Sequence, residues 1–437
     1  MGEVTVFWFR RDLRIEDNIG LYNALKSGVN VLPIFIFDPQ ILRQFPDKKN
    51  FQINLLIQFV RNLDLQLRTL GTSLSIFHKS PLESFEELLQ KHQIKSVYFN
   101  EDYEPEAIRR DDEIKRFLET KGVKTHSSTD QVIIKPGNLL KTNHTPYSIF
   151  TPFANRWKTI LIQTPELLKS VPSEDMATNY LSQDNISTFD FDSLGYTIDN
   201  HINITPHISL EIIRNYHLTR DIPALQNGTS RLGVHLRFGT ISIRKLVSIA
   251  VSLNEQFLNE LIWREFFMHI LYHFPHAERG SFKPRYDTIE WRNNEEEFLA
   301  WCNGETGIPI VDAGMRELNI TGFMHNRVRM IVASYLTKHL LIDWHWGEAY
   351  FAQHLVDFEL SANNGNWQWA SGSGCDAAPY FRIFNPYRQQ ERFDPNFEYI
   401  KRWVPEYQSE AYQKLLKTDL NLAKIRCLAV YKKALTL

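Results

Sequence analysis

The sequence predicts an α/β amino-terminal domain built on a parallel sheet, followed by an all-α carboxyl-terminal domain. Short β-rich apolar runs recur in the first hundred residues, and each is followed by a polar stretch long enough for a helix. From about residue 210 onward alternating strands are absent and long helical patterns dominate. The length of 437 residues exceeds one ordinary core, so we expect two domains.

The expected strands are residues 4–9, 30–37, 73–78 and 96–100. The stretch after the second strand carries Leu55, Phe59, Leu63 and Leu67 at helical spacing, which predicts an amphipathic helix. Strands that alternate with helices form parallel sheets with right-handed crossovers, as in Rossmann-like domains. We therefore assign residues 1–130 to the α/β domain.

The next stretch, residues 131–209, is rich in Ser, Thr, Asn, Asp and Pro, and it is predicted to be a connection between the domains. Long segments of this kind are rarely structureless in a compact protein, so we expect it to wrap over the first domain. Residues 210–437 form the predicted helical domain, with long helical patterns at 258–273 and 324–346.

Composition excludes several classes of protein. No apolar run approaches the roughly 20 residues of a membrane span, and the start of the chain lacks the order of a secretory signal, so a cytoplasmic protein is expected. The cysteines Cys302, Cys375 and Cys427 are odd in number and widely spaced. They argue against a disulfide framework and against a four-cysteine metal or iron-sulfur site, and no metal is expected. The formal net charge of −2 does not decide for or against nucleic acid.

The segment Asp357 to Pro386 is unlike a plain core segment. It gathers acids, the adjacent Asn363 and Asn364, and the indoles Trp367 and Trp369, which cannot all serve one apolar face. Such a set suits a ligand that is flat and aromatic in its body and polar at its edge. A flavin fits that description.

Six ordered motifs extend this pattern over nearly the whole chain. They are WFRRDLRIEDN (8–18), GTSRLGVHLRFGTIS (228–242), NELIWREF (259–266), TGFMHNRVRM (321–330), LLIDWHWGEAYF (340–351) and the segment 357–386. Each motif is weak singly, but their joint order and spacing are specific. With them the chain resembles the photolyase and cryptochrome family, and looks most like its class I DNA photolyases for cyclobutane pyrimidine dimers.

The resemblance implies an FAD site in the helical domain. Thr229 and Ser230 by themselves are more typical of a helix cap, but the resemblance reverses this, since the family uses this turn for the pyrophosphate. Gly233 stands where the family more often has Ser, and Glu359 where it often has Asp. The implied cofactor-binding residues are Tyr216, Thr229, Ser230, Arg231, Leu232, Gly233, Phe257, Arg329, Asp357, Phe358, Glu359 and Asn363. In this resemblance Asn363 faces the flavin N5, and Arg329 and Asp357 form a buried pair beside the ring.

The resemblance also implies catalytic and substrate residues. Trp367, Trp344 and Trp291 match the family's electron path to the photoexcited flavin, although each would singly be ordinary core. The implied lesion pocket is made of Glu260, Trp263, Arg264, Asn326, Arg327, Met330 and Trp369. Asn326 and Met330 follow the cyclobutane pattern and not the (6-4) pattern, and His325 is expected to be structural. The candidates for binding DNA phosphates are Arg327, Arg382, Arg388, Lys401 and Arg402.

The expected function is light-dependent splitting of pyrimidine dimers in DNA by a monomeric FAD enzyme. A cryptochrome-like photoreceptor and a (6-4) repair enzyme are the alternatives. The family's antenna domain matches the predicted α/β domain, with Glu106 retained where folate-binding relatives use an acid and Pro105 where they often use Asn. Methenyltetrahydrofolate, a deazaflavin and an empty cleft all stay open for the antenna.

Overall fold

The computed structural model describes residues 2–182, 188–198, 205–377, 379–415 and 418–436. Parts of the predicted connection, residues 183–187 and 199–204, therefore lie outside the described residues. The chain divides into two compact units. The first contains residues 1–140, 156–208 and 232–252, and the second contains residues 141–155, 209–231 and 253–437.

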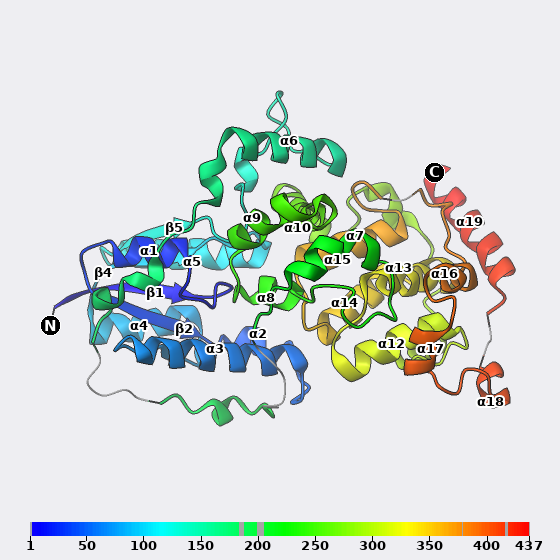
Figure 1. Ribbon diagram of the computed structural model, residues 1–437, viewed down its shortest axis with the longest axis horizontal. Helices are drawn as coiled ribbons and strands as arrows, with labels where there is room; N and C mark the ends of the chain where they lie inside the picture. The colour runs from blue at the N-terminus through cyan, green and yellow to red at the C-terminus, as the bar shows by residue number, and fades with distance from the viewer. Residues whose placement is uncertain (1, 183–187, 199–204, 378, 416–417, 437) are drawn as a thin grey trace. The chain divides into compact units, whose positions relative to one another are not determined.

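The first unit contains a five-stranded sheet in the order β3-β2-β1-β4-β5, with every neighbouring pair parallel. The strands are β1 (Glu3–Phe9), β2 (Val31–Ile36), β3 (Ser75–Phe77), β4 (Gln93–Asn100) and β5 (Lys124–Ser128). The predicted α/β fold is thus confirmed (Figure 1). The sequence pattern did not reveal β5, because this edge strand reads KTHSS and is partly exposed along its length.

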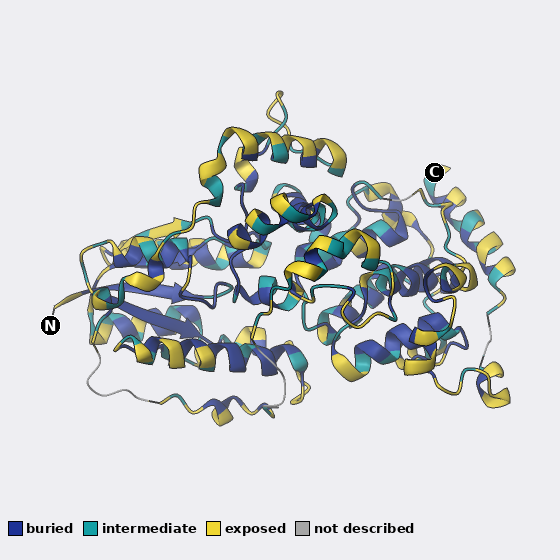
Figure 2. Cartoon of the chain, in the orientation of Figure 1, coloured by how far each residue is buried: buried dark blue, intermediate teal, exposed yellow. Residues whose placement is uncertain are grey.

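Helices separate the strands, as the periodicity predicted. They are α1 (Ile19–Leu25), α2 (Pro39–Leu42), α3 (Phe51–Thr69), α4 (Pro81–Lys91) and α5 (Pro105–Thr120). Helix α4 begins with a capping box in which Ser80 and Glu83 each accept the other's backbone N–H. Figure 2 shows the central strands as buried, and their apolar side chains form the core of this unit.

Parts of the connection pack on the first unit. The Tyr196 hydroxyl donates to the carbonyl oxygens of Leu42 and Phe45, both at 2.8 Å, and Asn179 donates to the carbonyl of Leu25 at 2.9 Å. Its regular elements are α6 (Phe150–Gln163) and the short 3-10 turns Pro136–Asn138, Pro165–Leu168, Ser173–Asp175, Ala177–Asn179 and Phe191–Leu194. Two further helices belong to the first unit, α8 (Gly233–Phe238) and α9 (Ile243–Leu253).

The second unit is helical, as predicted. Its helices are α7 (Leu210–Thr219), α10 (Glu255–His273), α11 (Glu295–Asn303), α12 (Pro309–Thr321), α13 (Asn326–Ser334), α14 (Trp344–His354), α15 (Leu360–Ser371), α16 (Pro386–Phe393), α17 (Glu398–Trp403), α18 (Glu410–Gln413) and α19 (Leu420–Thr436). Two 3-10 turns, Pro275–Glu278 and Pro284–Thr288, follow α10. The fully buried Trp301 and the buried Trp344 lie in one core cluster of this unit. None of the described helices is long and apolar enough to cross a membrane.

The single helical pattern expected over residues 324–346 is broken in the structure. Helix α13 ends at Ser334, a π-helical turn covers Tyr335–Leu340, and Leu341 adopts a left-handed conformation with φ of 55°. A left-handed residue cannot continue a right-handed helix. Asp343 then caps a new helix by accepting the His345 N–H at 3.1 Å. Apolar periodicity alone could not locate this break, because the residues on both sides of it are buried.

Candidate functional site

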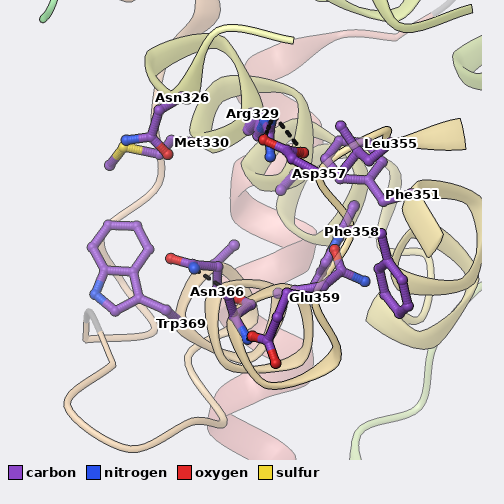
Figure 3. A pocket seen from close by; sticks show the side chains of 15 residues that line it. Asn326, Arg329, Met330, Phe351, Leu355, Asp357, Phe358, Glu359, Asn366 and Trp369 are labelled. Carbon is purple, nitrogen blue, oxygen red and sulfur yellow. Dashed lines mark hydrogen bonds and ion pairs between the residues drawn. The ribbon is translucent and has the colours of Figure 1, made fainter. Parts of the chain in front are cut away.

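A pocket of about 600 Å³, including its open mouth, lies in the second unit. Helices α13, α14 and α15 and the segment before α15 provide its walls (Figure 3). It is lined by Asn326, Arg329, Met330, Ala333, Phe351, Leu355, Asp357, Phe358, Glu359, Ala362, Asn363, Asn366, Trp367, Trp369 and Ala370. The pocket thus gathers one half of the segment that first indicated a flat aromatic ligand.

Helix α15 presents this segment through ordinary helix rules. Glu359 caps it by accepting the Ala362 N–H at 2.8 Å, and Gly372 ends it with a left-handed φ of 90°. Asn363 and Trp367 are four residues apart, and both line the pocket. Gln368 belongs to another face, since its amide donates to the carbonyls of Ala277 and Gly280 at 2.8 and 3.1 Å. The mixed composition of α15 therefore reflects two polar environments around one helix.

Arg329 and Asp357 form an ion pair at the pocket wall, as Figure 3 shows. The guanidinium Nη2 donates to both carboxylate oxygens at 3.0 and 3.1 Å, and Nε donates to the carbonyl of Met324 at 2.7 Å. The side chains keep 24% and 17% of their surface exposed, so the pair is only partly buried. Its opposite charges are balanced and are available to the polar edge of a ligand.

Asn363 has a partner that the sequence reasoning missed. Its Nδ2 donates to the backbone carbonyl of Glu348 at 3.1 Å and to Glu348 Oε1 at 2.8 Å. Because an amide nitrogen has two hydrogens, these bonds leave Asn363 with only its acceptor oxygen for a ligand. Burial raises the pKa of Glu348, against the lowering effect of the Asn363 hydrogen bond. The available signal was that Glu348 is one of two acids, with Asp343, in the motif at 340–351.

The three predicted tryptophans lie on segments that contact one another. Trp367 lines the pocket and lies against Gly347, where a side chain would clash with the indole. Gly347 is one helical turn from the buried Trp344 on α14. Two hydrogen bonds bring the neighbours of Trp291 beside those of Trp344. The Arg292 N–H donates to the Leu341 carbonyl at 2.8 Å. The Asp343 N–H donates to the side-chain oxygen Oδ1 of Asn293 at 2.9 Å.

Trp291 is half-buried, so this series runs from the pocket toward the surface of the unit. A fourth indole, Trp301, lies 6.1 Å from Trp367 between ring centroids, and sequence reasoning did not single it out.

The predicted substrate residues separate into two groups. Asn326, Met330 and Trp369 line the pocket, whereas Glu260, Trp263, Arg264 and Arg327 do not. Glu260 forms an ion pair with Arg220 and accepts a hydrogen bond from Gln256 at 2.9 Å. Arg220 was not predicted, although it lies four residues after the predicted Tyr216. Burial lowers the pKa of Arg220, but the charges of Glu260, Tyr216 and Asp221 and the hydrogen bond to Glu260 together outweigh burial, so the pKa is raised.

A chain of charges connects these two groups. Arg327 donates to Asp221 Oδ1 from Nε at 3.1 Å and from Nη2 at 2.7 Å, and its Nη1 lies 3.6 Å from the sulfur of Met330. Asp221 also lies 3.9 Å from the Arg220 guanidinium. Contacts through Arg220, Asp221 and Arg327 therefore run from Glu260 to the pocket residue Met330. A lone Arg-Asp dipeptide in a sequence gives no reason to expect this.

His325 has a structural role, as the sequence predicted. Its Nδ1 accepts the Arg327 N–H at 3.1 Å and caps α13. Burial, with the nearby Arg329 charge, lowers the pKa of His325 to about 4, so the ring is neutral at pH 7.

The remaining predicted cofactor residues are not in the pocket lining. Tyr216 packs edge-on against Phe257 at 5.2 Å between centroids, and burial raises its hydroxyl pKa. Arg231 has a left-handed φ of 52° and lies 4.5 Å from the Phe323 ring. Thr229 and Ser230 belong to the second unit, whereas Leu232 and Gly233 belong to the first.

Of the phosphate candidates outside the pocket region, Arg382, Arg388, Lys401 and Arg402 are all exposed. In the first unit, Glu106 is exposed and pairs with Arg109 at 3.3 Å. Among the described residues, no group of three or more His, Cys, Asp or Glu side chains is arranged to hold a metal.

The pocket's chemistry fits an isoalloxazine ring. Phe351, Leu355 and Ala333 provide apolar surface, while Arg329, Asp357 and Asn363 provide donors and acceptors at the edge. A flat heteroaromatic body needs contact along its faces and directed hydrogen bonds at its rim. The donor set contains no group of ligands typical of a metal.

Comparisons with known proteins agree with this fit. A family model described as the FAD binding domain of DNA photolyase matches residues 257–433, and one described as DNA photolyase matches residues 5–172. A deoxyribodipyrimidine photo-lyase of Synechococcus is 38% identical over 433 residues, covering 93% of this chain and 88% of that protein. One from Escherichia coli is 37% identical, covering 91% and 88%.

Solved structures give the same result. A bacterial class III photolyase from Agrobacterium tumefaciens matches with a TM-score of 0.85 and 30% identity, covering 100% of this chain and 98% of that one. An archaeal photolyase from Sulfolobus tokodaii, solved with two FAD molecules, matches with a TM-score of 0.80 and 33% identity, covering 98% and 100%. A Synechocystis cryptochrome has the same fold, with a TM-score of 0.85 and 24% identity over 98% and 99% of the two chains.

Proposed function

The chain belongs to the DNA photolyase family, with an FAD-binding domain at residues 257–433, and from this premise we propose that it splits cyclobutane pyrimidine dimers in DNA. The observation that carries the proposal is the composition of one pocket. Asn363 and the Arg329–Asp357 pair, suited to a flavin edge, line the same cavity as Asn326, Met330 and Trp369, suited to a lesion. A shared cavity allows an electron to pass over a short distance between cofactor and substrate.

FAD held in this pocket would supply light-driven electron transfer to the dimer, with return of the electron once the dimer has split. The protein's contribution is to position and to stabilise charge. Asn363, whose hydrogens are committed to Glu348, accepts a hydrogen bond from a protonated N5 and favours that state. Arg329, paired with Asp357, would balance charge at the ring edge.

The lesion side requires a base pair to open. Photolyases are among the enzymes that extrude their target from the duplex, and a dimer that stacks poorly lowers the cost of extrusion. Trp369 and Trp263 provide aromatic surfaces for the extruded bases, and Met330 provides a soft apolar wall. Glu260, charge-balanced by Arg220, can accept a hydrogen bond from the N–H edge of a pyrimidine.

The choice of lesion rests on Asn326, Met330 and His325. A (6-4) photoproduct requires proton transfer during repair, and the histidine at this site is poorly suited to supply it. His325 is buried, its pKa is lowered to about 4, and its Nδ1 is used to cap α13. A cyclobutane dimer, split by electron transfer alone, places no such demand on the residue.

The two indoles Trp369 and Trp263 test the proposal. We expect Trp369→Ala combined with Trp263→Ala to weaken binding of an oligonucleotide with one thymine dimer by at least about tenfold, since base stacking contributes about 1–3 kcal/mol per base. FAD content, measured by absorbance after purification, should be retained. Unchanged affinity for the lesion would contradict the pocket assignment. Binding should also weaken as salt is raised, because phosphate contacts release counterions.

A further inference from the structure

Phe150 lies flat against Trp263. The two ring centroids are 3.7 Å apart and the ring planes differ by 3°. Phe150 is remote in sequence, in the stretch predicted to connect the domains, yet residues 141–155 belong to the second unit. One part of the connection therefore supplies a ring to a predicted lesion residue.

The stack depends on anchors around it. Aromatic pairs usually keep their ring centroids roughly 4.5–7 Å apart, so parallel rings with centroids at 3.7 Å are an unusually close arrangement. Phe150 is held in place by its backbone N–H, which donates to Asp376 Oδ2 at 3.1 Å, and Asp376 itself has a left-handed φ of 46°. Three residues along the same helix, Phe153 packs on Phe266 and His269, each at 5.1 Å between centroids.

Other rings complete the cage around Trp263. Phe266 meets it edge-on at 5.5 Å and 81°, and Phe267 packs tilted at 5.5 Å and 30°. Phe266 also meets Phe150 edge-on at 5.9 Å. Trp263 is nevertheless only half-buried, so part of its indole is still available for contact with a ligand. The orientation of the indole is fixed by Phe266 and Phe267 on its own helix, α10, and by Phe150 on α6, which is distant in sequence.

We propose that Phe150 is a positioning residue for lesion recognition, which acts by backing one face of Trp263 and fixing the indole for stacking with an extruded pyrimidine. The inference rests on the proposed function, since it deepens the proposed role of Trp263 in binding the lesion. A side chain already fixed in its binding orientation loses less freedom when the ligand arrives, so affinity is gained without a new contact. Phe150 touches Trp263 and need not touch the substrate.

The matched variants are Phe150→Leu, which keeps an apolar side chain but removes the stack, and Phe153→Leu, which weakens the same helix without contacting Trp263 through a ring. We expect Phe150→Leu to lose about three- to tenfold in affinity for a thymine-dimer oligonucleotide relative to an undamaged one, the scale of an aromatic pair. Phe153→Leu should lower the melting temperature and leave this affinity ratio unchanged. Phe150→Tyr should restore the ratio.

A double-mutant cycle makes the assignment specific. If Phe150 acts through Trp263, Phe150→Leu should have no further effect on lesion affinity in a Trp263→Ala background. Additive losses, an unchanged affinity ratio in folded Phe150→Leu protein, or tighter lesion binding would each overturn the inference. The wild-type arm separates the two proposals: wild type that does not prefer the lesion refutes the proposed function, whereas wild type that prefers it while Phe150→Leu binds equally well refutes only the role of Phe150.

Discussion

Replacing Glu348 by Leu should alter the redox balance of the flavin site through Asn363. Glu348 Oε1 lies 2.8 Å from Asn363 Nδ2 and holds the amide in the orientation that presents only its oxygen. Leu has a side chain of similar size without an acceptor, so the backbone carbonyl at residue 348 is left as the single acceptor. The amide can then turn and present its N–H groups to an unprotonated N5. The variant should lose the preference for the N5-protonated flavin.

The magnitude follows from one hydrogen bond. Such a bond contributes about 0.5–1.5 kcal/mol net, which corresponds to roughly a two- to tenfold change in the ratio of the two flavin states. At about 59 mV per tenfold change for one electron, the midpoint potential should fall by roughly 20–65 mV. Spectroelectrochemical titration of the purified holoprotein measures this shift. The rate of photoreduction under blue light in the presence of an external thiol should fall in parallel.

Glu348→Gln is the matched control. Burial raises the pKa of Glu348 and favours its neutral form, and Gln is a neutral isostere whose Oε1 can still accept from Asn363. Its potential should therefore stay near that of wild type. Two results would refute the reasoning: a Leu variant with the wild-type potential, or a Gln variant shifted as far as the Leu variant.

Three further predictions concern other parts of the second unit. Trp367→Phe should slow photoreduction of the flavin at least about tenfold, because it interrupts the indole series at the pocket. Variant protein that has been reduced chemically beforehand should repair at the wild-type rate. A variant that is photoreduced as fast as wild type would contradict this electron path. Asp221→Asn should raise affinity for undamaged DNA by about 1.5- to 5-fold at low salt, since it frees Arg327 from an exposed ion pair, and gel-shift titrations that show no gain would reject that coupling. Burial lowers the pKa of Lys338 to about 7. Between pH 7 and the ordinary lysine pKa of about 10.5, the unfolded chain therefore binds more protons than the folded chain. The free energy of unfolding should rise with pH over this range by up to about 1.4 kcal/mol per pH unit. Lys338→Met should remove that contribution to thermal unfolding measured from pH 7 to 9, and an unchanged pH dependence would contradict the assignment.

The fold was largely predictable because its main elements obey simple periods. The apolar strands β1, β2 and β4 are buried and could be read directly, whereas the polar edge strand β5 could not. The break at Leu341 was hidden because burial continues on both sides of it. Local pattern also cannot show that residues 141–155 pack with the second unit, since that depends on contacts such as Phe150 with Trp263.

The site was predictable where a motif carried the chemistry and not where a partner did. Asn363, Asp357 and Met330 were found from their motifs, and all line one pocket. Glu348 and Arg220 were missed because each acts by contacting a residue distant in sequence, Asn363 in one case and Glu260 in the other. Hydrogen-bond partners depend on how helices pack against one another, and that information is not contained in a short motif.

Light-dependent repair measures the central claim most directly. Purified, chemically reduced protein is illuminated in parallel with oligonucleotides that contain one thymine dimer or one (6-4) photoproduct, with dark samples as controls. We predict that only the thymine dimer is restored to two thymines, and only in the light. Restoration of the (6-4) product alone would contradict the assignment of Asn326 and Met330. Restoration of neither would contradict repair and favour a photoreceptor.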